Sequence, residues 1–142
     1  MFCFNIQGEP QSEARPRARR IGKGVSIYSP KSKERKAVRK EMAFYAPPEP
    51  SEGIFTLHIV AFFSRPNSHY GRKNGQPYLK NIEYFKETKP DIDNIAKFYM
   101  DAMNGIFYAD DKQVVRVTAI KRYVRDEESP HVEITLREVG EM

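Results

Sequence analysis

The chain has one cysteine in 142 residues, and it has no apolar stretch long enough to cross a membrane. The single cysteine, Cys3, cannot form an internal disulfide, which excludes a disulfide-stabilised scaffold and fits a reducing cytoplasm. A membrane-spanning helix needs about 18 consecutive apolar residues. The alternation of Phe2, Phe4 and Ile6 predicts a strand at the N-terminus and not a signal peptide or a membrane span. We therefore expect a cytoplasmic protein with no membrane partner.

Several common catalytic signatures are also missing from the sequence. It contains no internal repeat, no Gly-rich phosphate-binding loop, no Cys/His set of the kind that binds zinc, and no Ser-His-Asp constellation. We therefore expect no organic cofactor.

Acidic residues are scarce in one part of the chain. The net charge is +5, but the basic segment 15–40 holds eleven Lys or Arg and only Glu34 as an acid, so it carries +10 and the remainder −5. This segregation is typical of a surface that faces a polyanion, and a solvated basic face is the alternative. The residues that we predict to bind a DNA backbone are Arg15, Arg17, Arg19, Arg20, Lys23, Lys31 and Lys89.

The hydrophobic pattern predicts a few regular elements within one domain, residues 1–142, which is large enough for one core. The glycines among the arginines at 15–24 favour a mobile loop, and segment 65–88 has the composition of a long functional loop. The predicted elements are a strand over 1–6, a helix over 31–45 with Val38, Met42 and Tyr45 inward, a central strand over 54–63, a helix over 92–104, and strands over 114–124 and 131–138 that form a C-terminal hairpin.

Carboxylates gather at the two ends of the predicted helix 92–104. Asp91 is well placed to cap its first turn, and Asp93 lies beside it at the positive end of the helix dipole, which favours the ionised form of both. Lys97 follows Asp93 at i+4, the spacing of a surface ion pair or of a cation that contacts phosphate. The pair Asp110-Asp111 follows the helix, about 20 Å from its start. It reaches the first pair only if the chain doubles back, or if a second subunit completes the site.

Converging carboxylates are the ligands that Mg²⁺ prefers, with Mn²⁺ as a possible substitute. The spacing alone does not establish such a site. Asp91 can be only a helix cap, Asp93 and Lys97 only a solvated pair, and Asp110-Asp111 only turn residues. An EF-hand calcium loop is excluded, because Ala96 and Ala102 occupy the positions of its glycine and its last glutamate.

The motif region 89–115 as a whole resembles the signature of the RusA family of Holliday-junction resolvases. The resemblance implies an α+β fold, a single domain with a mixed β-sheet and about two main helices. It extends more weakly upstream, to Gly8-Glu9-Pro10, Arg15-Pro16-Arg17 and Tyr28-Ser29-Pro30-Lys31. The matching stretches are Asp91-x-Asp93-Asn94-x-x-Lys97, Asp101-Ala102-Met103-Asn104-Gly105 and Asp110-Asp111-x-Gln113-Val114.

The same resemblance implies a function and assigns roles to residues. It implies a Mg²⁺-dependent endodeoxyribonuclease, a homodimer that resolves four-way DNA junctions by paired nicks during recombination and repair. Asp91, Asp93 and Asp111 match the family's catalytic, magnesium-binding acids, and Lys97 matches its functional lysine. Asp110 matches the acid beside the third ligand and takes a supporting role.

Two alternatives stay open at this point. Pro90-Asp91 followed by Asp110-Asp111-Lys112 matches the loose Pro-Asp…Asp-x-Lys pattern of restriction-like nucleases, with Lys112 as the positioning cation. We place it second, because a helix follows Asp91 directly. The chain can also be a non-catalytic DNA-binding module whose acids only cap and solvate a helix.

Overall fold

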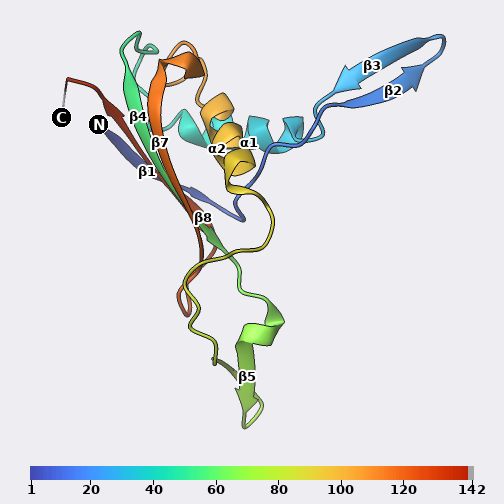
Figure 1. The fold of residues 1–142 in the computed structure, drawn as a ribbon, viewed down its shortest axis with the longest axis vertical. Helices are drawn as coiled ribbons and strands as arrows, with labels where there is room; N and C mark the ends of the chain where they lie inside the picture. The colour runs from blue at the N-terminus through green and yellow to red at the C-terminus, as the bar shows by residue number, and fades with distance from the viewer. Residues whose placement is uncertain (141–142) are drawn as a thin grey trace.

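The computed structural model of the chain describes residues 1–140 and shows one α+β domain built on a four-stranded mixed sheet (Figure 1). The strand order is β1-β8-β4-β7, with β4 antiparallel to β8 and parallel to β7. The elements in chain order are β1 (Phe2–Gln7), β2 (Arg17–Ile21), β3 (Gly24–Tyr28), α1 (Ser32–Met42), β4 (Phe55–Phe63), η1 (Asn67–His69), β5 (Tyr70–Lys73), β6 (Gln76–Leu79), α2 (Ile92–Ala102), η2 (Asp111–Gln113), β7 (Val114–Tyr123) and β8 (His131–Glu138).

Strand β4 lies between two partners, as its sequence predicts. Phe55, Leu57 and Ile59 point toward the helices and are fully or almost fully buried. Phe62, on the opposite face, is also buried. A strand that is apolar on both faces is stable only where both faces are covered, which accounts for its interior position.

Helices α1 and α2 pack on the same face of the sheet (Figure 1). Val38 and Met42 of α1 are buried as predicted, whereas Tyr45 follows the helix and remains 46% exposed. Helix α2 ends two residues earlier than predicted, and Arg39 of α1 donates to the carbonyls of Ala102 (2.8 Å) and Asn104 (2.6 Å) at this end. Among the described residues, no helix is both long and apolar enough to span a membrane.

The predicted C-terminal hairpin is wrong. Strands β7 and β8 exist, but β4 lies between them, so they share no hydrogen bonds. Alternation of apolar residues reports which face of a strand is buried and does not report its neighbour. Helix α2 lies in the crossover between β4 and β7, which are parallel, and this crossover carries the motif region past the sheet.

The two segments predicted as loops both contain hairpins. The glycines at 22 and 24 do not loosen the arginine segment, because Gly22 (φ +57°) serves the tight turn between β2 and β3. The long segment 65–88 contains β5 and β6, which are joined by Asn74-Gly75. Both hairpins project from the body of the domain (Figure 1).

Candidate functional site

The polar face of α2 carries Asp93, Lys97 and Asp101 at i, i+4 and i+8. Burial of Ile95 and Phe98 in the core directs this face away from the core. The three polar residues line an open pocket of about 570 Å³. The rest of the pocket lining is Glu13, Ala14, Arg15, Pro16, Ser29, Arg35 and Asn94.

The wall opposite α2 is the segment that precedes β2. The Gln11 N–H donates to the hydroxyl of Tyr99 (2.9 Å), and the Glu13 N–H donates to the Asn94 carbonyl (2.8 Å). Arg35 of α1 forms an ion pair with the Glu13 carboxylate. These contacts fix the start of the basic segment over the carboxylate-bearing face of α2.

Two buried tyrosines support the site from inside the core. Burial raises the pKa of Tyr99 well above its usual range, so its hydroxyl stays neutral where it accepts the N–H of Gln11. The pKa of Tyr108 is raised by burial and then by the nearby Asp111, and its hydroxyl donates to the Met100 carbonyl (2.7 Å). The second contact ties the chain that follows α2 back onto the helix.

The Asp110-Asp111 pair lies in a short, well-braced turn, η2. The Asp110 carboxylate accepts the N–H of Lys112 (3.0 Å), while the Asp110 N–H donates to the side chain of Gln113 (2.9 Å). The pKa of Asp110 is lowered, mainly by the hydrogen bond from the Lys112 backbone. Gln113 in turn donates to the carbonyls of Ser51 (2.9 Å) and Gly53 (2.8 Å). The position of the pair is therefore set by hydrogen bonds on both sides.

The structure brings Asp111 to Asp101 at the C-terminal part of α2. The Asp101 side chain lies within hydrogen-bonding reach of Asp111 and raises the pKa of Asp111 to about 6, with smaller contributions from partial burial and from Asp110. Two carboxylates this close favour sharing a proton over both being ionised. A bound cation would relieve the same repulsion. The two carboxylates, those of Asp101 and Asp111, therefore have the chemistry of cation ligands.

We expect the titration of Asp111 to depend on Asp101. In ¹³C NMR of the side-chain carboxyl carbons, Asp111 should titrate near pH 6 in the wild-type protein and nearer its ordinary 3.8 in Asp101→Asn. Because the folded-state pKa is raised, the favourable contribution of Asp111 to stability is complete below about pH 4 and is lost as the pH rises through 6. Asp101→Asn should therefore melt at a higher temperature than wild type at pH 7 but not at pH 4. An unchanged midpoint for Asp111 would contradict the contact.

The three acids that the sequence predicts as metal ligands are not gathered within one protomer. Across residues 1–140, no three acidic, histidine or cysteine side chains are close enough together to hold a metal ion. Asp91 and Asp93 lie at the start of α2, whose 11 residues extend about 16 Å. Asp111 lies near the other end, so the chain does not double back along the helix. The metal-binding roles of Asp91, Asp93 and Asp111 stay a prediction.

Asp91 occupies the N-cap position of α2 but makes no side-chain capping hydrogen bond, contrary to the capping role expected from sequence. Its carboxylate is exposed and is free of that role. The backbone before it is held by Lys121 of β7, whose ammonium donates to the carbonyls of Thr88 (2.7 Å) and Pro90 (2.8 Å). Lys121 is thus a positioning residue for the start of the motif.

The predicted DNA-binding residues are divided among four places. Arg15 lines the pocket beside Asp93, Lys31 donates to the Gln11 side chain (3.1 Å), and Lys89 is exposed just before the α2 motif. The β2–β3 hairpin exposes the other four, Arg17, Arg19, Arg20 and Lys23.

Sequence reasoning underrated Asp101 and missed Lys121. Asp101 lies eight residues after Asp93, which is two i+4 steps along one helix face, so that signal was available. The strand pattern around Lys121 does not predict its hydrogen bonds to the carbonyls of Thr88 and Pro90. Both candidate lysines lie beside acids, Lys97 in the pocket with Asp93 and Lys112 beside Asp110 in η2.

Comparison with known proteins adds two similarities. Residues 7–137 match the model of the family described as Endodeoxyribonuclease RusA. The chain is also similar to the uncharacterized protein YqaN of Bacillus subtilis (strain 168), with 31% identity over 141 residues, which cover 96% of each sequence.

Proposed function

The chain belongs to the RusA family of endodeoxyribonucleases, and from this premise we propose that it cuts four-way DNA junctions by paired nicks in a Mg²⁺-dependent reaction. Junction resolution of this kind serves DNA recombination and repair. The observation that carries the proposal is the placement of Asp93, Lys97 and Asp101 in one pocket with Arg15, at the root of the basic β2–β3 hairpin. Carboxylates, a lysine and an arginine within one pocket suit a reacting phosphodiester.

The cations of the pocket have distinct roles in this proposal. Arg15 and Arg35 lie opposite the acids of α2, where they can orient a phosphate. Arg35 is already paired with Glu13, so Arg15 is the better candidate for direct contact. Lys97 lies between Asp93 and Asp101 along the helix, where its ammonium can stabilise negative charge that develops on a phosphate.

We propose that a second copy of the chain completes the acidic site. A two-fold axis that makes the two α2 helices antiparallel would place Asp93 of one subunit near Asp111 of the other. Apolar residues around α2 and β7 support such an interface, because Ile92, Val115 and Val117 are 41%, 64% and 38% exposed. A homodimer also offers two equivalent sites to the two strands that a junction resolvase cuts.

The proposed cation is Mg²⁺, with Mn²⁺ as a substitute. Asp91, Asp93 and Asp111 would hold it, with Asp110 in a supporting role. Asp101 joins this set on the strength of its contact with Asp111. When bound, the ion supplies charge neutralisation and an activated water. The raised pKa of Asp111 means that ligation competes with a proton, so the Mg²⁺ requirement should increase below about pH 6.

A junction assay tests the proposal directly. We expect the wild-type protein to cut a four-way junction in preference to a flap or a linear duplex, and only when Mg²⁺ or Mn²⁺ is present. A supercoiled plasmid that extrudes a cruciform should become linear and not remain a nicked circle, because the two cuts are paired. Light scattering should give the mass of a dimer at micromolar concentration.

Three results would count against this function. DNA that is shifted in a gel but never cut would support the non-catalytic module. Equal cutting of the junction and the linear duplex would remove junction selectivity. A monomer mass, both with and without junction DNA, would remove the shared site.

A further inference from the structure

The β5–β6 hairpin projects from the body of the domain. It leaves the body in a different direction from β2–β3, and α2 lies on the side of the sheet from which β2–β3 projects (Figure 1). Its turn is Asn74-Gly75, with both residues at positive φ (53° and 78°), which is the two-residue turn that suits a twisted hairpin. The register runs from Tyr70 opposite Leu79 to Lys73 opposite Gln76.

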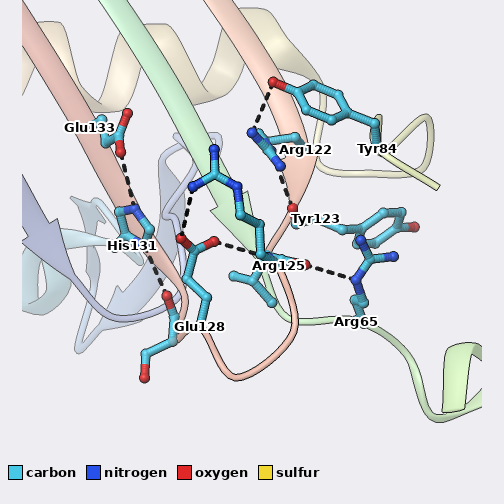
Figure 2. A network of polar contacts seen from close by, with 10 residues as sticks. Arg65, Tyr84, Arg122, Tyr123, Arg125, Glu128, His131 and Glu133 are labelled. Carbon is cyan, nitrogen blue, oxygen red and sulfur yellow. Dashed lines mark hydrogen bonds and ion pairs between the residues drawn. The ribbon is translucent and has the colours of Figure 1, made fainter. Parts of the chain in front are cut away.

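The outgoing end of this projection is fastened to the sheet. Arg65 donates to the carbonyls of Val124 (2.8 Å) and Asn81 (3.0 Å) and to Nδ1 of His69 (3.2 Å). Its guanidinium also lies over the ring of Tyr123, 5.4 Å from the centroid, and Figure 2 shows Arg65 beside this ring. The two strands of the hairpin are joined at the base, since the His69 carbonyl accepts the N–H groups of residues 80 and 81.

The returning chain is fastened as well. Arg122 of β7 lies between two rings, 3.7 Å from the centroid of Tyr84 and 4.7 Å from that of Phe62, and it donates to the Tyr84 hydroxyl (2.9 Å) (Figure 2). Tyr84 in turn accepts the N–H of Tyr123 at its carbonyl (2.9 Å). A projection fastened at both ends holds its direction, and the pre-set direction lowers the entropy that binding a partner must overcome.

The hairpin itself carries positive charge and a flat aromatic ring. From residue 64 to residue 82 there are four Lys or Arg and no carboxylate. Arg65 is used internally, which leaves Arg72, Lys73 and Lys80 exposed. Tyr78 lies over Gly71, where a side-chain carbon would come within 2.7 Å of the ring, and it is 49% exposed. Positive side chains beside an exposed aromatic ring are typical of sites that bind single-stranded nucleic acid.

We propose that β5–β6 is a second DNA-binding arm, which rests on the proposed junction-cutting function. It takes a branch of DNA other than the one held by β2–β3. Arg72 and Lys73 contact the phosphate backbone of that branch, and Tyr78 stacks on a base that is unpaired near the branch point. The two hairpins leave the body in different directions, so a DNA with two diverging arms engages both, whereas a straight duplex engages one. This arm contributes selectivity for branched DNA.

The test is a binding measurement in EDTA, which keeps it independent of cleavage. Fluorescence anisotropy compares a four-way junction with a linear duplex for wild type and for Arg72→Ala/Lys73→Ala. The loss of two phosphate contacts should weaken junction binding about ten- to a hundredfold and lower the salt slope by about 2, with duplex binding unchanged. The matched control is Arg116→Ala/Arg137→Ala, which removes two exposed arginines from the strands of the main sheet.

Substitutions of Tyr78 distinguish the contribution of base stacking from that of positive charge. Tyr78→Ala should weaken junction binding several-fold without a change in salt slope, and Tyr78→Phe should restore it, because stacking needs only the ring. A 2-aminopurine placed at the branch point should be quenched by wild type and by Tyr78→Phe but not by Tyr78→Ala.

Each remaining outcome overturns the inference. An equal loss for the junction and the duplex, or an equal loss in the control, would reduce the effect to general electrostatics. Unchanged junction binding in Arg72→Ala/Lys73→Ala, with wild type still preferring junctions, would remove the second arm and leave the proposed function standing. Wild type that binds neither DNA would remove both. Thermal melts identical to wild type would confirm that these exposed substitutions leave the fold intact.

Discussion

Asp93→Asn is expected to reduce junction cleavage by several orders of magnitude while DNA binding remains at the wild-type level or tightens. The amide keeps the size of the side chain but is no longer a hard anionic ligand, and phosphodiester hydrolysis depends on the cation that such a ligand holds. We expect binding to survive, because the proposed backbone contacts come from the basic hairpins and not from the acids. Binding can tighten because one negative charge near the phosphate is removed. Asp91→Asn and Asp111→Asn should behave in the same way.

The controls for this prediction come from the same region. Asp101→Asn should also lower turnover, by a smaller factor, because Asp101 acts on Asp111. Asp126→Asn, an exposed acid in the turn after β7, should leave cleavage unchanged. Full activity of Asp93→Asn in Mg²⁺, with wild-type contamination excluded, would remove this residue from the site.

A mixing experiment decides which subunit supplies which acid. Asp93→Asn and Asp111→Asn are each expected to be inactive as homodimers. If the site takes Asp93 from one subunit and Asp111 from the other, a heterodimer of the two variants contains one intact site, and nicking returns without paired cutting. If all the acids come from one chain, the heterodimer stays inactive.

The second large effect is expected from the β2–β3 hairpin. Replacing Arg17, Arg19 and Arg20 by Ala together with Arg15 should weaken binding to every DNA tested by orders of magnitude. The slope of the logarithm of the binding constant against the logarithm of the salt concentration should also become less steep by up to about 4. Each phosphate that the protein no longer neutralises keeps its counterions, so fewer ions are released on binding. Fluorescence titrations between low and moderate salt measure both quantities.

This prediction also states that the loss of affinity is the same for every DNA sequence. We expect these arginines to contact phosphates, and phosphate contacts carry no sequence information directly. A loss confined to one DNA sequence would instead indicate base contacts. Unchanged affinity and salt slope would make the segment a solvated basic face.

The elements with strong patterns could be predicted from the sequence. Strand β4 is apolar on both faces and occupies the interior of the sheet, and α2 follows the amphipathic stripe that begins at Ile95. Ile92 belongs to the same stripe but is exposed, because it lies at the first turn, where the helix extends beyond the body of the core. Periodicity identifies a face and does not show what covers it.

The wrong or missed features have one physical cause in common. Each depends on contacts between residues that are far apart in the sequence, and local patterns do not report such contacts. The position of β4 between β7 and β8 depends on which strands pair, and alternation within each strand is the same for any pairing. The arginine hairpin has no buried face, so it has no hydrophobic pattern to detect. Asp101 meets Asp111 only through the return of the chain after α2, which the Tyr108 contact to Met100 sets.

The sheet has an order of assembly built into it. Strand β8 is the last of the four main strands in chain order, but in the sheet it lies between the first two, β1 and β4. Until β8 is synthesised, β1 has no partner in the main sheet and β4 has a bare edge, so the nascent chain cannot close its core. Helix α2 and its carboxylates then have no finished sheet to rest on. A product that is terminated before β8 should therefore lack a finished site.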